Sequence, residues 1–210
     1  MEGHIGKAKP LLEESIRLFS VTQTVARRYA INIAAAYNYL GDIERSQSEL
    51  YSALEMYQKA LEFCDRSELY SSWIVFATNA GMTAFALGDY NLATTYFELS
   101  YELCLQYTIN RRKPTIEAYL GLLAQIEGEK EEALRYLESA YKDGMVEQHH
   151  QEVGRVHWAI CFLKSEYPSV EVDRTFSKSL NTYGTIALQQ LDGYGDVWER
   201  TYLDQLLQAE

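Results

Sequence analysis

Four histidines and three cysteines are the side chains of this sequence that could bind a transition metal. His150, His157 and Cys161 are spaced i, i+7 and i+11, so they share one face if the segment is helical. Imidazole nitrogen and thiolate sulfur are ligands that zinc prefers, but a structural zinc site takes four of them and no fourth partner is evident. We therefore favour helix capping or core packing for these side chains, and we predict no metal and no cofactor.

Paired carboxylates are a second group that could do chemistry, because two neighbouring acids can act as general acid and base. Glu13-Glu14 and Glu131-Glu132 fall at expected helix starts or on polar helix faces. There they interact favourably with the helix dipole or simply face water. The sequence contains no GxSxG, P-loop, GxGxxG or HExxH motif. We therefore predict that the protein is not an enzyme.

The composition indicates a folded, helical protein. Of the 210 residues, 47% are hydrophobic and 23% are charged, which is typical of a folded domain. Only 3 are proline, and Ala, Leu, Glu and Gln, which lose little rotamer freedom in a helix, are frequent. The composition predicts an all-α fold.

Charge and cysteine usage narrow the partners and the compartment. A net charge of -11 repels nucleic-acid phosphates, and Arg111-Arg112-Lys113 is the largest basic cluster, so we expect no direct nucleic-acid partner. Three scattered cysteines without a CxxC pair indicate the reducing cytoplasm. No apolar run approaches the ~18 residues of a membrane span, and no signal peptide is evident, so we expect no membrane partner.

Internal similarity is the strongest pattern in the sequence. Turns are predicted at Gly3, Gly41, Gly88, Gly128 and Tyr167-Pro168, and each is followed by the same alternation of small and large residues. The matching positions are Ile5, Ala8, Leu12, Ser15 and Ile16; Ile43, Ser46, Leu50, Ala53 and Leu54; Tyr90, Ala93, Phe97, Ser100 and Tyr101; Lys130, Ala133, Leu137, Ala140 and Tyr141; and Ser169, Val172, Phe176, Ser179 and Leu180. Such a stripe lets two antiparallel helices pack closely.

Small residues also recur in the helix before each turn. Ala34, Gly81 and Gly121 each lie seven residues before a turn glycine, where a partner helix would approach closely. The intervals between the predicted turns are 38, 47, 40 and 39 residues. The 47-residue interval is interpreted as a unit of about 40 residues with one extra heptad, because Ala53, Tyr57, Ala60 and Leu61 repeat the stripe.

These patterns resemble the tetratricopeptide repeat family. Ala80-Gly81 with Phe85, Leu120-Gly121, and Ala93 with Phe97 echo parts of its motif, although its repeat is only ~34 residues long. Repeats of about 40 residues are also similar to the helical sensor regions of large bacterial regulators. The resemblance implies an α-α superhelix, a right-handed solenoid of antiparallel helix hairpins with a concave groove.

We predict one repeat domain over residues 1–210. It comprises a half repeat at 1–20, repeats at about 22–64, 67–107, 113–143 and 147–183, and a C-terminal capping helix at 196–208, which Asp196 and Glu199 would open as a capping box. The expected helices are 4–19, 22–40, 42–64, 67–87, 90–107, 113–127, 130–143, 147–165 and 169–183. Because no helix precedes the first copy, we interpret the chain as a domain excised from a larger protein.

In this architecture the first helix of each pair lines the groove. The groove candidates are Arg28, Asn32, Asn38, Tyr39, Thr78, Asn79, Met82, Phe85, Tyr119, Leu122, Gln125 and His157.

Two arrangements of groove side chains could hold a peptide. Asn32 and Asn79 each lie nine residues before a turn glycine, and stacked amides could bond a peptide backbone. The alternative is that each amide bonds within its own hairpin or faces solvent. Arg28 and Asn32, spaced i and i+4, are similar to the carboxylate clamp with which some cochaperones hold a peptide terminus. The third repeat has Thr115 and Tyr119 there, so this clamp is incomplete.

The sequence therefore predicts a cytoplasmic, non-catalytic scaffold that binds a protein or peptide in its groove. The first alternative is a ligand-sensing regulatory domain of a larger signalling or transcription-regulator protein. The second is self-association, because exposed repeat ends can stack on another copy.

Overall fold

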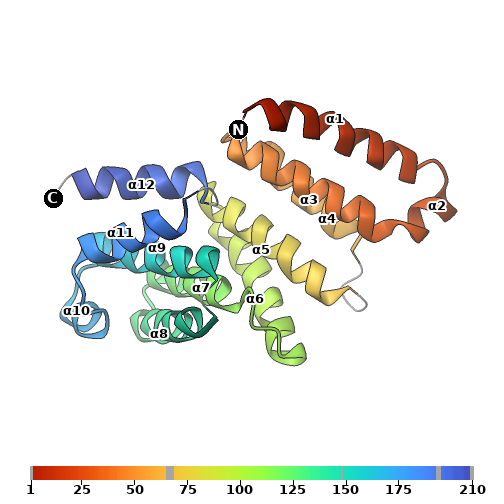
Figure 1. Ribbon diagram of the computed structural model, residues 1–210. Helices are drawn as coiled ribbons and strands as arrows, with labels where there is room; N and C mark the ends of the chain where they lie inside the picture. Colours follow the sequence, from red (N-terminus) through yellow and green to blue (C-terminus); the bar gives the residue numbers. More distant parts are fainter. Residues whose placement is uncertain (1, 65–68, 148, 193–194, 209–210) are drawn as a thin grey trace. The chain divides into compact units, whose positions relative to one another are not determined.

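The protein was analysed as a computed structural model that describes residues 2–64, 69–147, 149–192 and 195–208 (Figure 1). Every regular element in these ranges is an α-helix, which confirms the predicted all-α class. The described helices are α1 (Glu2–Phe19), α2 (Gln23–Arg28), α3 (Ala30–Ser46), α4 (Leu50–Glu62), α5 (Tyr70–Ala86), α6 (Tyr90–Tyr107), α7 (Lys113–Glu127), α8 (Lys130–Glu147), α9 (His150–Glu166), α10 (Val170–Thr175), α11 (Leu180–Gln190) and α12 (Val197–Gln208).

Helices that follow one another along the chain pack antiparallel within two compact units, residues 1–96 and 97–210. In the first unit α3 packs on α1 and α4, and α4 packs on α5. In the second unit α7 packs on α8 and α9, and α9 packs on α8 and α11. The predicted single repeat domain over the whole chain stays a prediction.

The predicted turn at Gly41 is wrong. Gly41 lies buried inside α3, and the chain turns seven residues later, where Ser48 adopts a left-handed backbone with φ of 65°. The predicted turns at Gly88 and Gly128 are confirmed, with φ of 78° and 91°. Because Ser48, Gly88 and Gly128 are spaced 40 residues apart, the interval of 47 residues and its extra heptad came from the wrong turn.

The corrected turn also corrects the stripe that follows it. Residues that match one another after the three left-handed positions are all fully buried: Ala53, Tyr57 and Ala60 on α4; Ala93, Phe97 and Ser100 on α6; and Ala133, Leu137 and Ala140 on α8. Three glycines also occupy equivalent positions, because Gly41, Gly81 and Gly121 each precede a left-handed residue by seven positions. Gly41 thus takes the place predicted for Ala34.

Other helix boundaries also differ from the prediction. The expected helix 22–40 is divided at Tyr29, which separates α2 from α3. The expected helix 169–183 is divided into α10 and α11, because Ser179 is extended and its hydroxyl accepts a bond from the Thr182 N–H. α1 runs from Glu2 to Phe19 with Pro10 inside it, so Gly3, where a turn was predicted, is helical.

The expected C-terminal helix appears as α12, and Glu199 Oε2 accepts a 2.9 Å hydrogen bond from the Asp196 backbone N–H, as in the predicted capping box.

None of the helices in the described ranges is both long enough and apolar enough to cross a membrane.

Candidate binding pocket

Nine of the twelve groove candidates are interior side chains. Those in the first unit are Asn38, Thr78, Asn79, Met82 and Phe85, and those in the second are Tyr119, Leu122, Gln125 and His157. The expectation that they face an open groove does not describe this structure, because neighbouring helices enclose them. Arg28, Asn32 and Tyr39 are the three candidates with exposed side chains.

The predicted stack of Asn32 on Asn79 is not formed. The Asn79 side chain donates a 3.0 Å hydrogen bond to Asn38 Oδ1, and Asn38 in turn donates to Asp42 Oδ2 at 3.4 Å. Asn32 is exposed on α3. The turn error explains the difference, because Asn32 and Asn79 no longer share a register once Ser48 replaces Gly41. Asn79 therefore joins α5 to α3 inside the first unit.

The incomplete clamp of Arg28 and Asn32 is also not formed. Arg28 is the last residue of α2, whereas Asn32 belongs to α3, so their spacing no longer places them on one helix face. The Arg28 guanidinium lies 6.0 Å from the centroid of the Tyr29 ring.

The three candidate metal ligands lie on α9, where His157 and Cys161 are buried and His150 is exposed. His157 is buried, its Nδ1 donates to the Val153 carbonyl at 2.7 Å, and its ring contacts those of Tyr141 and Tyr183. Desolvation lowers the pKa of His157, against the opposing effect of the Val153 bond. His150 is exposed, with Nδ1 2.5 Å from Gln190 Oε1. Within the described ranges, no group of three or more His, Cys, Asp or Glu could hold a metal.

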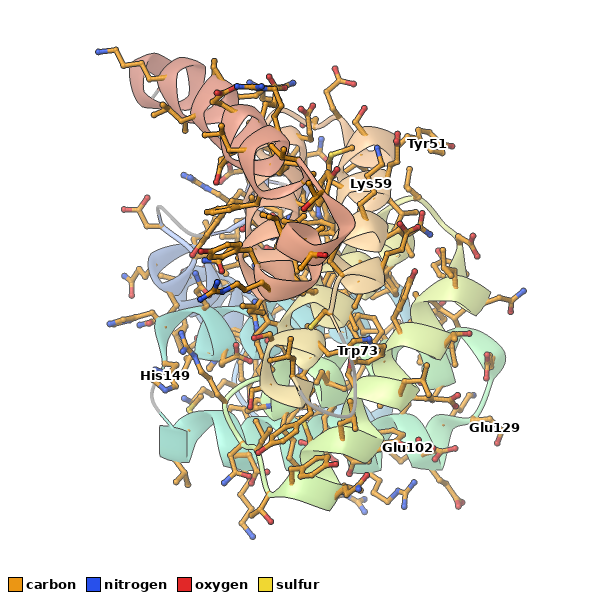
Figure 2. The ribbon with its side chains drawn as sticks, turned by 90° about the vertical axis from the view of Figure 1, so that its right-hand side faces the viewer. Tyr51, Lys59, Trp73, Glu102, Glu129 and His149 are labelled. Atoms are coloured by element: carbon orange, nitrogen blue, oxygen red, sulfur yellow. The ribbon has the colours of Figure 1, made fainter. Side chains whose placement is uncertain are left out.

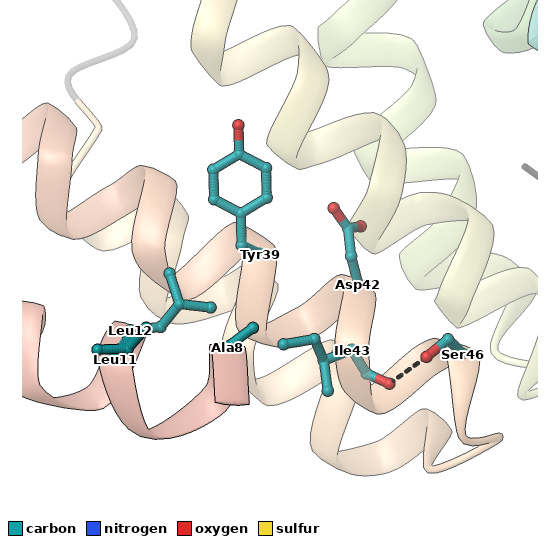
Figure 3. A pocket seen from close by; sticks show the side chains of 7 residues that line it. All are labelled: Ala8, Leu11, Leu12, Tyr39, Asp42, Ile43 and Ser46. Atoms are coloured by element: carbon teal, nitrogen blue, oxygen red, sulfur yellow. Dashed lines mark hydrogen bonds between the residues drawn. The ribbon is translucent and has the colours of Figure 1, made fainter. Parts of the chain in front are cut away.

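A pocket of about 490 Å³ opens at the surface of the first unit between α1 and α3. Its lining residues are Ala8, Leu11 and Leu12 of α1 and Tyr39, Asp42, Ile43 and Ser46 of α3 (Figure 3).

Helical spacing brings these residues together. On α1 the lining positions follow an i, i+3, i+4 pattern, and on α3 they follow i, i+3, i+4, i+7, so each set forms one helix face. An ion pair at 2.6 Å between Lys9 Nζ and Glu44 Oε1 joins the same two helices. Ile43 and Ser46, assigned by the sequence to the packing stripe of a hairpin, line this pocket instead.

The pocket has an apolar wall, and the polar groups of Asp42 and Ser46 in it already have partners. Asp42 Oδ1 accepts a 2.8 Å hydrogen bond from the Tyr57 hydroxyl, and the Ser46 hydroxyl donates to the Ile43 carbonyl at 2.7 Å (Figure 3). Leu11 is 70% exposed and Tyr39 is 58% exposed. This arrangement can receive apolar groups, and it pairs no nucleophile with a base.

No family model matches this sequence, and no curated protein matches it. The resemblance to the tetratricopeptide repeat therefore stays a prediction from the residues.

Sequence reasoning missed the α1 side of the pocket. The packing stripe of the first copy includes Ala8 and Leu12 but leaves out Leu11 and Leu18, which are seven residues apart on one face and 70% and 52% exposed. The sequence did contain a signal for this surface, because α1 has more large apolar residues than one packing stripe requires. Exposure alone is a weaker signal, because Tyr51 is 79% exposed and projects singly from α4 (Figure 2).

Proposed function

We propose that this protein is a non-catalytic scaffold that binds a protein or peptide segment through the pocket between α1 and α3. The observation that carries the proposal is the pairing of Leu11 and Tyr39, two large exposed side chains from different helices, on one open apolar pocket. Single exposed apolar residues are ordinary on protein surfaces, whereas a contiguous set marks a binding site. Tyr39 is also one of the residues predicted to contact a partner.

The positions of the turns support the repeat architecture on which this proposal builds. Left-handed residues recur 40 residues apart at Ser48, Gly88 and Gly128, and the fully buried stripes recur with them. A tetratricopeptide-like solenoid of helix hairpins accounts for this spacing, and such solenoids use their surfaces to bind other proteins.

The chemistry of the pocket favours apolar side chains on a neutral or basic segment. Fully burying a leucine side chain is worth about 1.5–3 kcal/mol, so covering Leu11 and Tyr39 would supply part of the binding free energy. Asp42 is one of the lining residues, and the net charge of -11 disfavours an acidic partner. We propose that Leu11, Leu12 and Ile43 receive the apolar side chains.

Selection of short random peptides displayed on phage tests this proposal. A selected peptide should bind the purified wild-type chain in calorimetric titration, and Leu11→Asp should weaken that binding at least about tenfold, since it removes apolar contact and adds a charge. Tyr51→Asp is the matched control, because Tyr51 is also a large exposed side chain, on α4, but lies outside the pocket. Peptides that bind both variants equally, or no selected peptide at all, would refute the proposal.

The pocket volume favours one second function, a ligand-sensing regulatory domain. About 490 Å³ lies within the ~300–1,000 Å³ that small-molecule sites occupy. A metabolite that binds here should raise the unfolding temperature of the wild-type chain, because a ligand that binds only the folded state stabilises it. A thermal-shift panel with Leu11→Asp as the comparison separates this function from peptide binding.

A further inference from the structure

The last described helix, α12, lies against α9 and α11 in the second unit. Trp198 of α12 meets Trp158 of α9 edge to face, with ring centroids 4.9 Å apart. Tyr202, one turn further along α12, lies 5.8 Å from the Trp158 ring and 5.6 Å from the Phe162 ring. In Figure 1, α12 and α8 lie on opposite sides of α9. α12 therefore covers a face of α9 that the second helix of the hairpin α7–α8 leaves free.

A buried ion pair stands at the centre of this contact. Glu199 Oε1 accepts hydrogen bonds from Arg155 Nε at 3.2 Å and from the Tyr119 hydroxyl at 3.1 Å. All three side chains are at most 3% exposed. Removing two charges from water costs free energy that their attraction only partly offsets, so a buried pair is a weak source of stability. Its clearest effect is to select which helix fits this position.

We call the part of the surface beneath α12 that α7 and α9 contribute, namely Tyr119, Arg155, Trp158 and Phe162, the α12 seat. Tyr119 stacks on Trp158 with ring centroids 5.9 Å apart, and Trp158 lies 5.6 Å from Phe162. Aromatic residues around one arginine are the composition typical of the energetic centre of a protein interface. Without α12, the seat would present a cation within a row of aromatic rings.

α12 itself has the properties of a docked peptide. It has 12 residues, and isolated helices of about this length are marginal in water, so its order depends on its packing against α9 and α11. Glu199 and Leu203 are fully buried on its inner side, whereas Asp204 and Gln205 are exposed on its outer side. A short amphipathic helix laid on an apolar surface is a common way for a protein to hold a segment of its partner.

We propose that α12 is an intramolecular ligand of the α12 seat, and that a helical segment of a partner protein with the same side-chain pattern binds the seat by displacing α12. In this pattern an acidic residue comes directly after one aromatic residue and three positions before another. Glu199 has this place between Trp198 and Tyr202. This inference rests on the proposed function, that the chain binds protein segments. It adds a second surface with a different partner chemistry.

The ion pair explains why the partner must be acidic at this position. A helix without the carboxylate would lose the Glu199 bond to buried Arg155, and a basic helix would place two like charges together. Because α12 is tethered, its effective concentration at the seat is on the order of millimolar, so a free segment has to compete with it. The seat is thereby closed to weakly binding segments.

A fluorescent synthetic peptide of residues 195–208 tests the proposal by fluorescence anisotropy. In the full chain, Trp198→Ala combined with Leu203→Ala removes the ring contact with Trp158 and a buried apolar side chain of α12, which weakens its docking and leaves the seat intact. We expect the peptide to bind this double variant at least about tenfold more tightly than it binds the wild-type chain, because the tethered competitor is weakened. Gln205→Ala, exposed on the same helix, should bind as weakly as the wild type. Equal binding to all three proteins would overturn the proposal.

Charge reversal tests the role of Arg155. In the full chain Arg155→Glu sets two carboxylates against each other and should release α12. That variant should bind a peptide carrying Glu199→Arg at least about tenfold more tightly than the unmodified peptide. The absence of this preference would overturn the assignment of Arg155 as the recognition group.

Hydrogen exchange on the wild-type chain gives a result even where Arg155→Glu does not fold. Excess peptide should speed up amide exchange in α12 while α7 stays protected. Unchanged exchange in α12 would overturn displacement. Light scattering tests whether α12 is exchanged between two copies. A dimer that dissociates when the peptide is added would show such an exchange and would overturn the intramolecular assignment.

The proposed pocket and the proposed seat can be tested independently of each other. Leu11→Asp should leave binding of the 195–208 peptide unchanged, because Leu11 belongs to the pocket in the first unit and the seat belongs to the second. Loss of both peptides on Leu11→Asp would instead indicate unfolding, which circular dichroism of that variant detects.

Discussion

The ring of Tyr57 lies so close to the backbone of Gly41 that a Cβ added to Gly41 would stand 2.5 Å from Tyr57 Cε1. The same relationship recurs 80 residues later, where a Cβ at Gly121 would stand 2.7 Å from Leu137 Cγ. In both hairpins the first helix gives up a side chain so that the second helix can insert a large one. This close approach explains a glycine in the interior of α3, where glycine otherwise lowers helix stability.

Gly41→Ala should lower the free energy of unfolding by about 1–3 kcal/mol, because the new methyl group overpacks the fully buried Tyr57 ring. Gly6→Ala is the matched control, since Gly6 is also helical but has no atom within 4 Å of a new Cβ. That control should raise stability by roughly 0.5–1 kcal/mol. Urea unfolding of both variants measures these changes in the free energy of unfolding. Equal changes in the two variants would contradict the prediction.

The left-handed residues at the turns predict opposite effects for two substitutions. Ser48→Gly should stabilise the protein by up to about 1 kcal/mol, because a non-glycine residue at φ of 65° carries a steric cost. Gly128→Ala should destabilise it by about 1 kcal/mol, because φ is 91° there. Thermal unfolding of the two variants measures both signs. Two changes of the same sign would contradict the turn at Ser48.

Asn79→Ala should cost about 1–3 kcal/mol, because Asn38 Oδ1 loses the donor that satisfies it inside the first unit. Asn32→Ala, on exposed α3 surface, should change stability by no more than about 0.5 kcal/mol. A double-mutant cycle with Asn38→Ala should show coupling between the two buried amides. Independent effects of Asn38 and Asn79 in chemical denaturation would argue against this bond.

Buried His157 predicts a loss of stability in mild acid. Its pKa is lowered in the folded state by desolvation, so it resists protonation while the unfolded chain accepts a proton. Above the ordinary pKa of about 6.5, the folded and unfolded states differ little in the protonation of this imidazole. The free energy of unfolding falls as the pH drops below that value, by at most about 1.4 kcal/mol per pH unit.

Replacing the imidazole should remove this part of the pH dependence. His157→Phe keeps a ring against Tyr141 and Tyr183 but cannot take up a proton. Urea unfolding of the variant and the wild type at pH 7.5 and pH 5.5 measures the effect. The stability of the variant relative to the wild type should rise at the lower pH, and a constant difference would show that His157 does not contribute.

Much of the helical framework could be predicted from residues near one another in the chain. Alternating small and large residues placed the stripes of α6 and α8, and Gly88 and Gly128 marked two turns, because stripe spacing and positive φ are local properties. Asp196 and Glu199 likewise marked the start of α12. These features depend on a few neighbouring residues, so the sequence alone contains them.

The tertiary structure decided the rest, because it depends on which helices meet. A glycine serves equally for a turn and for a close helix contact, and only the approach of Tyr57 shows that Gly41 serves the second purpose. The burial of Asn79 requires α3 beside α5, and the exposure of Leu11 follows from how α1 lies on α3. The position of Glu199 on Arg155 joins residues 44 positions apart, a contact that no local pattern specifies.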